Sequence, residues 1–369
     1  MTAPSRGVTV SAEELSALVA RLFMAAGIPQ RAAQTVADAL VDADLEGVPS
    51  HGVMLMDMYL DRIRGGSVSA GEKAVVVSDR DAAVVLDARN ALGQLTADQA
   101  TGIAVERARR HGVGIVAVRH GFHFGTARRY AVKAASADCV GIVMCNTRPL
   151  MPAPGGAERL VGNNPIAIAV PSDGPIPIVL DMATSEAAMG KIRLAEKAGQ
   201  PIPETWAVKS DGSQTTSASD AIAGMLLPSG GPKGFGLSFL IDLLCGLLSG
   251  GASGAGVQPL YGDPAVPYDC SHLFIAIDVA HFGDPAAIRA TAAAAAERVR
   301  SGKRAPGVAQ VYAPGEPEWR RHQGAEDQVH LAPAVTDMLI RMTRELRVSA
   351  MPLARDDEQS TREGGHVQA

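Results

Sequence analysis

The sequence predicts an α+β protein built around a mixed or largely antiparallel sheet. Helical patterns occupy both ends of the chain, and short β-branched runs bounded by Gly, Asn, Asp and Pro fill its middle. Several of these runs follow one another directly, as at 164–181, where only the tight connection "PSDGP" intervenes. A strict succession of parallel strands would need a helix at each crossover, so we expect antiparallel pairs.

The first 66 residues are predicted to form three helices. Ser11 and Glu14 make a capping-box pattern in front of "ELSALVARLFMAAG". A second helix is expected over about 30–45. A third is expected to start at Ser50 and to run to the Gly65-Gly66 pair.

The remaining elements are predicted from a change in the hydrophobic periodicity after residue 66. Seven runs are predicted as strands: "AVVVSD", "AAVVLDA", "VGIVAVRH", "VGIVMCNT", "NPIAIAVPS", "IPIVLDMATS" and "LFIAIDVAHF". Helices are predicted at about 93–110, 126–137, 185–198 and 232–250, and in "DPAAIRATAAAAAERVRSG" and "APAVTDMLIRMTRELRV". We therefore expect residues 1–72 and 284–350 to form one helical domain beside a sheet domain over 73–283. The polar residues 351–369 are expected to be a disordered tail.

Composition narrows the class of protein. The 369 residues carry 34 basic and 39 acidic side chains, without a concentrated basic stripe, so nucleic acid is not an expected partner. Cys139, Cys145, Cys245 and Cys270 lie far apart and fit neither a metal site nor a disulfide framework, which favours a reducing cytoplasm. The N-terminus lacks the apolar core of a signal peptide. The stretch "GFGLSFLIDLLCGLLSGG" contains Asp242 and is expected to be too short to span a membrane.

The first candidate for chemistry is His51, in the predicted first turn of the third helix. Free N–H groups and the positive end of the dipole disfavour an imidazolium there, and a neutral imidazole can relay a proton near neutral pH. The alternative is that Ser50 caps the helix and His51 is merely exposed beside it. A Ser-His nucleophile pair is disfavoured, since neighbouring side chains at a helix start are expected to diverge.

His120 and His123 fall in the turn between a strand and a helix, in "RHGFHFGTARRYA". An H-x-x-H pair could bind a metal, but no completing carboxylate or cysteine set is evident, so no metal site is predicted. His123 could simply pack beside Phe122 and Phe124. Its turn position before Gly125 favours a role in lining a site.

The dinucleotide fingerprint G-x-G-x-x-G is absent, because Ala117 stands where "GVGIVAVRHG" would need its third glycine. Two weaker anion signals are present. A strand ending at Asp181 is followed by small polar residues and a helix with Lys191, and such a turn exposes N–H groups that can cradle phosphate. The Gly-rich "PSGGPKGFGLSF" offers Lys233 as a second anion contact, or as an ordinary solvated lysine.

Taken in order, "SHGV", "HFG", "GNNPIA", "LDMATS", "GKI", "GGPKGFGL" and "PGE" resemble the malate/L-lactate dehydrogenase family that is unrelated to the Rossmann-fold enzymes. The resemblance spans about residues 8–345. The family also contains sulfolactate, ureidoglycolate, diketogulonate and piperideine-2-carboxylate oxidoreductases. The resemblance implies a non-Rossmann, L-sulfolactate-dehydrogenase-like fold, an NAD(P)-binding domain over 73–283 and a homodimer. It implies NAD or NADP as cofactor, of which we favour NAD.

The resemblance also implies roles for individual residues. His51 matches the proton donor/acceptor, Ser50 its hydrogen-bonding neighbour, and His123 the histidine beside nicotinamide and substrate. The implied cofactor contacts are Asn164, Asp181, Met182, Ala183, Thr184, Ser185, Pro232, Lys233, Gly315 and Glu316.

Two departures from the family pattern concern the substrate. Leu55 stands where the family has an arginine one turn after His51, and leucine cannot bind a carboxylate bidentately. The family's N-S-x-H reads His120-Gly121-Phe122-His123 here, so a serine hydroxyl is lost and an imidazole is gained. We therefore expect a bulkier or less anionic substrate, or a carboxylate held by His120, His123 or a helix N-terminus.

The sequence thus predicts an oxidoreductase that transfers a hydride between nicotinamide and C2 of a 2-hydroxy/2-oxo acid, with His51 handling the proton. One alternative is a reductase of a cyclic imine or substituted 2-oxo acid. Others are a non-catalytic NAD(P)-binding protein, which would not need the Ser50-His51 pair, and a metal-dependent hydrolase using His51, His120 and His123.

Overall fold

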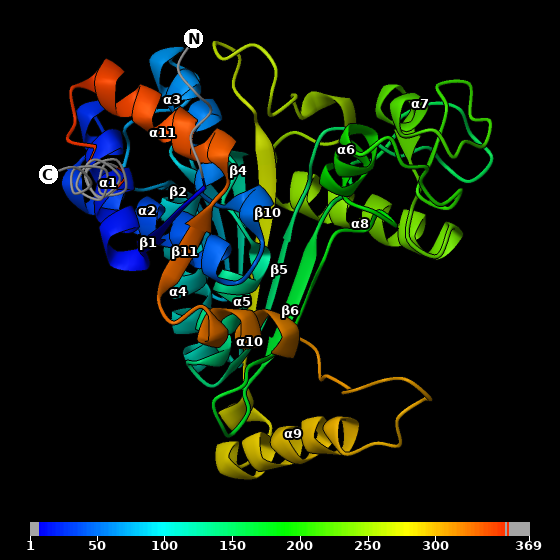
Figure 1. The fold of residues 1–369 in the computed structure, drawn as a ribbon. Coiled ribbons are helices and arrows are strands. Elements are labelled where there is room, and N and C mark those ends of the chain that lie inside the picture. The colour runs from blue at the N-terminus through cyan, green and yellow to red at the C-terminus, as the bar shows by residue number, and fades with distance from the viewer. Residues whose placement is uncertain (1–6, 351–352, 354–369) are drawn as a thin grey trace, which may run out of the picture.

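The structure is a computed structural model that describes residues 7–350 and residue 353. A seven-stranded sheet lies at its centre, with helices on both sides (Figure 1). The strands are β2 (Val75–Arg80), β3 (Ala83–Asp87), β4 (Val113–Gly121), β5 (Cys139–Cys145), β6 (Ile166–Val170), β7 (Ile178–Met182) and β10 (Cys270–Asp278). The predicted tail lies outside the described residues, apart from Leu353.

The strand order is β2-β3-β4-β10-β5-β6-β7. The β3–β4 pair is parallel and the other five pairs are antiparallel. The seven runs predicted as strands are these seven strands, and the expectation of a mixed, largely antiparallel sheet is confirmed.

Alternating side chains give the sheet two different faces, as the period of two requires. On one face Val116, Val143 and Phe274 join the cluster covered by α4 (Gly93–His111) and α5 (Ala127–Ala135). On the other face, Leu273 and its neighbours pack under α8 (Pro232–Ser249). Each of these strands therefore contributes to two cores.

A helical cluster forms beside the sheet from both ends of the chain. Its helices are α1 (Ala12–Ala25), α2 (Gln30–Leu45), α3 (Met56–Arg64) and α11 (Pro333–Leu346). Ser11 caps α1 by accepting a hydrogen bond from Glu14 N at 3.2 Å, as the capping box predicts. Strand β1 (Val8–Ser11) pairs with β11 (Gln328–Leu331) and joins the two ends. Helix α9 (Pro285–Arg300) lies away from this cluster, at the far end of the sheet (Figure 1). The predicted domain boundaries stay a prediction.

A smaller lobe carries α6 (Met189–Lys197), α7 (Ala218–Ala223) and the short pair β8 (Ala207–Val208) and β9 (Met225–Leu226). It packs around Met151, Val161 and Ile192 in a separate apolar cluster. Neither α7 nor α10 (Glu316–Gly324) was predicted, since both are short and carry little apolar periodicity.

Helix α8 corrects one expectation. Its 18 residues have a mean hydropathy of 1.3, so by length and composition alone it is able to cross a membrane. One side of the helix is nevertheless buried on the sheet. Asp242 on that side accepts a hydrogen bond from Asn146 Nδ2 at 3.0 Å, so this buried carboxyl has a polar partner.

Candidate active site

The chain around the first candidate histidine is not a continuous helix. Pro49–His51 and Val53–Leu55 are separate 3-10 turns, and α3 begins only at Met56. Gly52 between them is extended, with φ −93° and ψ −157°. The prediction of one helix from Ser50 is therefore wrong, because the backbone leaves helical geometry at Gly52.

Asp44, near the end of α2, accounts for this break. Its Oδ2 accepts a hydrogen bond from Val53 N at 2.8 Å. A Cβ on residue 52 would lie 2.2 Å from Asp44 Oδ1, so Gly52 is needed for this close approach. Burial raises the pKa of Asp44 to about 7, although the hydrogen bond from Val53 opposes the shift.

Sequence reasoning missed Asp44, although a signal was available. A carboxylate in the last turn of a helix opposes the helix dipole and needs another reason to be there. Here the reason is the tertiary contact that fixes the segment carrying His51.

His51 and His123 stack on each other, with ring centroids 5.4 Å apart and ring planes inclined by 25°. Burial lowers the pKa of His51. Burial and then the neighbouring His51 and His272 lower the pKa of His123 to about 3. Both rings are therefore neutral at physiological pH, as the stacked arrangement requires.

The Nδ1 atom of each ring has a partner within the protein. Ser50 Oγ lies 3.0 Å from His51 Nδ1, so the two neighbouring side chains do meet, contrary to the expectation that they diverge. A 3-10 turn does not impose the α-helical angle between them. Tyr59 Oη lies 2.9 Å from His123 Nδ1. Among the described residues no hydrogen bond reaches Nε2 of His51 or His123, which leaves these atoms for a ligand.

Tyr59 and Gln94 hold the His123 ring in place through a chain of hydrogen bonds. Neither residue was predicted to belong to the site. Gln94 Nε2 donates to Tyr59 Oη at 2.7 Å, and Tyr59 is fully buried. Phe122 packs edge-on against Tyr59, with centroids 5.1 Å apart. The sequence held no sign of this contact, because α3, α4 and the turn after β4 meet only in the fold.

Leu55 and His120 each have a structural contact that the sequence did not predict. Leu55 is 2% exposed and belongs to the core of the helical cluster, and the break at Gly52 removes the helical spacing that was to set it beside His51. His120 Nδ1 lies 3.0 Å from Asp87 Oδ1 at the end of β3. Substrate contact by either residue stays a prediction.

The two small-residue segments expected to bind cofactor lie side by side. Ser229 N donates to Thr184 O at 2.9 Å, and Glu186 N donates to Leu227 O at 2.8 Å. Ser185 forms an isolated bridge with Pro228. The end of β7 at Met182 and the turn 183–185 are thereby joined to the segment that leads into α8, which carries Pro232 and Lys233.

This junction has the features that a phosphate-bearing cofactor needs. The Thr184 hydroxyl is buried and has no hydrogen-bond partner. Gly231 ends the loop before α8 with φ +64° and gives that helix no side-chain cap. Lys233 is exposed in the first helical turn. Uncapped N–H groups at the start of an 18-residue helix favour an anion, so these residues fit a nicotinamide dinucleotide.

The other expected cofactor residues have structural contacts. Asn164 is fully buried, accepts from Thr147 N at 2.8 Å and donates to Ser238 O at 2.9 Å. Asp181 Oδ2 accepts from Arg128 N at 3.0 Å at the start of α5. Although the residue keeps exposed surface, burial of its carboxyl raises the pKa of Asp181 to about 6.

Gly315 and Glu316 lie at the start of α10, next to β7. A Cβ on Gly315 would lie 2.5 Å from Val179 Cγ1. Glu316 is fully buried, and Arg300 and Arg320 each donate to its carboxylate at 2.8 Å. Burial disfavours the charged carboxylate, but these hydrogen bonds outweigh it and lower the pKa of Glu316. Both carboxylate oxygens of Glu316 thus have an arginine partner, and contact of Gly315 and Glu316 with the cofactor stays a prediction.

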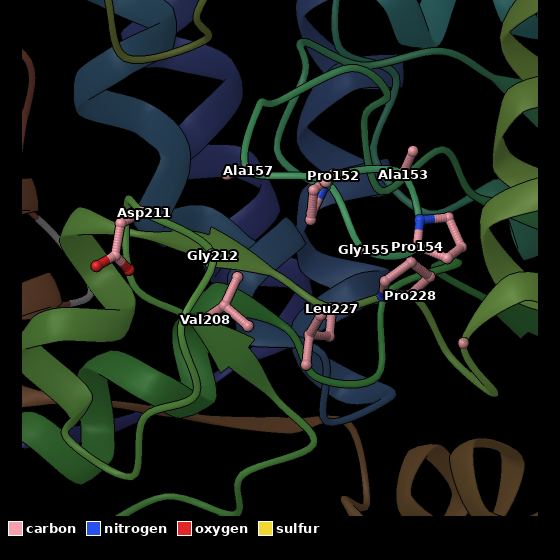
Figure 2. A pocket seen from close by; sticks show the side chains of 12 residues that line it. Pro152, Ala153, Pro154, Gly155, Ala157, Val208, Asp211, Gly212, Leu227 and Pro228 are labelled. Atoms are coloured by element: carbon pink, nitrogen blue, oxygen red, sulfur yellow. The ribbon is translucent and has the colours of Figure 1, made fainter.

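A cavity of about 210 Å³ opens beside the start of α8 (Figure 2). It is lined by the loop 152–157, by Leu227 and Pro228, and by Gly231, which precedes Pro232. Its lining therefore adjoins the proposed phosphate-binding junction rather than the two stacked histidines. Within residues 7–350 and 353, no group of three or more His, Cys, Asp and Glu residues is placed to hold a metal ion.

Comparisons with known proteins identify the family of the chain. The family model for malate/L-lactate dehydrogenase matches residues 10–339. The chain belongs to this family. It is 36% identical over 317 residues to a malate dehydrogenase of Pyrococcus abyssi, covering 84% of this chain and 86% of that protein. It is 32% identical over 332 residues to an NAD(+) ureidoglycolate dehydrogenase of Escherichia coli O157:H7, covering 90% and 95%.

The fold agrees as well. The sulfolactate dehydrogenase of Methanocaldococcus jannaschii superposes with a TM-score of 0.88 at 32% identity, covering 93% of this chain and 98% of that one. The predicted α+β fold class and the family resemblance are thus confirmed. As a member of the malate/L-lactate dehydrogenase family, the protein is a dehydrogenase.

Proposed function

We propose that the protein interconverts a 2-hydroxy acid and a 2-oxo acid of the malate, lactate or sulfolactate type with NAD or NADP, and that His51 exchanges the proton on the C2 oxygen. The observation that carries this proposal is the stacked, neutral His51–His123 pair. The Nδ1 atoms of the two rings are hydrogen-bonded to Ser50 and Tyr59.

The proton chemistry follows from this arrangement. When Nδ1 of His51 accepts a hydrogen bond from Ser50 Oγ, its ring proton is on Nε2, which is the atom left for a ligand. His51 can then donate to a carbonyl oxygen on C2 during reduction and accept the proton during oxidation. His123, stacked on His51, can orient that oxygen through its own Nε2, because Tyr59 and Gln94 hold its ring in place.

The cofactor supplies the hydride, which no side chain of the protein can provide. The malate, sulfolactate and ureidoglycolate relatives are named as dehydrogenases, and one of them carries NAD(+) in its name. Thr184, the start of α8 and Lys233 are the residues of this chain that would hold the phosphates. We favour NAD, and equal assays with NADH and NADPH decide between the two.

The test is His51→Gln, which keeps a polar side chain of similar length. We expect turnover of 2-oxo acids to fall by about 10²–10⁴-fold while the cofactor still binds, because only the proton transfer is lost. His111→Gln, at the exposed end of α4, is the matched control and should retain full activity. Unchanged turnover in His51→Gln would remove His51 from the mechanism, and loss of cofactor binding would assign it a different role.

We further propose that the protein is a homodimer in which a second copy covers the outward face of α8. Leu240, Leu247 and Leu248 on this face are 57%, 71% and 50% exposed. Monomeric proteins rarely leave so contiguous an apolar face in water. Light scattering after size exclusion should give a dimer for the wild type and a monomer for Leu247→Asp. A monomeric wild type at micromolar concentration would contradict the assembly.

A further inference from the structure

Two arginines project from a hairpin-like loop that follows β5. Arg148 comes three residues after the end of β5, and Arg159 lies on the returning limb. The limbs are held together because Leu150 N and Met151 N both donate to Val161 O, at 2.8 and 2.9 Å. Arg148 and Arg159 therefore lie on the two limbs of the same loop.

A third arginine, Arg193, reaches this loop from α6. Its neighbour Ile192 is fully buried in the cluster that contains Met151 and Val161. Burial, and then the like charge of Arg159 followed by that of Arg193, lowers the pKa of Arg148, with Tyr268 opposing the shift. Three guanidinium groups thus share one region at a mutual electrostatic cost.

No carboxylate of the described residues compensates these charges. None of the three arginines forms an ion pair with an Asp or Glu within residues 7–350 and 353, although the arginines of α9 and α10 do. Arg159 donates to the carbonyl oxygens of Ala223 and Gly224, which carry no net charge. An anion bound here would relieve the repulsion and gain charge-assisted hydrogen bonds.

The backbone that presents Arg148 is rigid. Asn146 donates to Asp242 Oδ1 at 3.0 Å and accepts from Ser271 N at 2.7 Å, and Thr147 N donates to Asn164 Oδ1 at 2.8 Å. The two residues before Arg148 are therefore tied to the sheet and to α8. A guanidinium on so fixed a backbone is preorganised to bind.

The topology brings Arg148 to the same end of the sheet as the stacked histidines. The start of β10 pairs with the ends of both neighbours, as Cys270↔Gly121 and His272↔Cys145. Strands β4 and β5 therefore end at the same edge, about 10 Å apart across β10. His123 follows β4 and Arg148 follows β5 at that edge.

An aromatic residue links the two positions. Tyr268 is buried and stacks edge-on against Phe122, next to His123, with centroids 6.2 Å apart. The Arg148 guanidinium opposes the upward shift that burial gives the pKa of Tyr268. The two neutral histidines supply no positive charge for an acid substrate, whereas the arginines supply it from the adjoining strand end.

We propose that Arg148, supported by Arg193 and Arg159, is the subsite that binds an acidic group of the substrate, a carboxylate or a sulfonate. The proposal rests on the function proposed above. The phosphates of the cofactor share this chemistry, and separate kinetic constants distinguish the two sources.

The kinetic test compares Arg148→Gln with Arg31→Gln, an exposed arginine on α2 that serves as the matched control. For oxaloacetate reduction we expect the KM of the acid to rise at least tenfold in Arg148→Gln, with kcat within threefold and the cofactor KM within twofold. Arg148→Lys should recover part of the affinity, because it keeps the charge but not the bidentate geometry. An acid KM equal to that of Arg31→Gln, or a rise in the cofactor KM alone, overturns the proposal.

A binding test separates failure of the subsite from failure of the proposed function. Calorimetric titration with malonate, an unreactive dicarboxylate, needs no turnover. We expect affinity to fall at least tenfold in Arg148→Gln and to fall measurably in Arg193→Gln, with far-UV circular dichroism unchanged. If no 2-oxo acid is reduced but malonate binding still depends on Arg148, the subsite stands and the proposed function fails. If malonate binds the wild type and Arg148→Gln equally well, the subsite is refuted.

Discussion

Replacing Asp44 by asparagine should make the protein more stable at alkaline pH. The amide oxygen can still accept the hydrogen bond from Val53 N, so the segment that carries His51 keeps its anchor. The change removes only the ionisable carboxyl, whose pKa burial raises from 3.8 to about 7. For an acid with a raised folded pKa, stability is fully present below the unfolded pKa and is lost as pH rises through the folded one.

The magnitude follows from these two pKa values. Between pH 5 and pH 7 the unfolded chain has released the proton while the folded protein still holds it. One pKa unit corresponds to about 1.4 kcal/mol, so Asp44 alone lowers the free energy of unfolding by roughly 2–3 kcal/mol between pH 5 and pH 8. An asparagine side chain does not titrate, so this part of the pH dependence should disappear in Asp44→Asn.

The assay is denaturant unfolding of the wild type and Asp44→Asn at pH 5, 6, 7 and 8. Asp61→Asn is the matched control, since that side chain is 58% exposed and has only a 3.9 Å contact with Arg64. The stability difference between Asp44→Asn and wild type should grow with pH, whereas that of Asp61→Asn should stay nearly constant. A difference for Asp44→Asn that is flat from pH 5 to pH 8 would refute the reasoning.

Three further outcomes are expected. Tyr59→Phe removes the hydroxyl that orients His123, so kcat/KM should fall about fivefold to tenfold, the equivalent of one hydrogen bond, and a fall in KM with unchanged kcat/KM would contradict this role. Gly52→Ala brings a methyl group against the Asp44 carboxylate and should reduce activity strongly, and Asp44→Ala in the same chain should restore part of it if that clash is the cause. Lys233→Ala should weaken cofactor binding by about 1–3 kcal/mol if the ammonium meets a phosphate, as fluorescence titration with NADH can measure, and an unchanged dissociation constant would favour a solvated lysine.

Most of the sheet could be predicted because its signal is local. Each of the seven runs is rich in β-branched residues and bounded by turn residues. In the central strands of the sheet, successive side chains also alternate between two buried faces. Each run could therefore be predicted as a strand from its own residues. The helices α1 and α2 were equally readable from the capping box at Ser11 and from their apolar periodicity. The strand order was not predictable, because β10 enters between β4 and β5 from more than a hundred residues away.

The sequence predicted some residues of the candidate site, but not how they contact one another. The histidines His51 and His123 were found from the sequence, but their stacking and their partners come from other elements. The helix expected from Ser50 failed because a contact with Asp44, invisible to local propensity, overrides it at Gly52. The expected place of Leu55 beside His51 depended on that helix, and its contact with substrate stays a prediction.

The pairing of β1 with β11 has a consequence for synthesis of the protein. Val8↔Leu331 and Ser11↔Gln328 are its outer pairs, and Ala12 N donates to Asp327 O at 2.8 Å. Helices α1 and α2 leave the ribosome well before the strand and helix that complete their core. At about 5–20 residues per second the nascent N-terminal helices wait roughly 15–60 s with apolar surface uncovered. During this interval of translation a chaperone would be needed to protect that surface. A stop codon before β11 would leave the helical cluster without its closing strand.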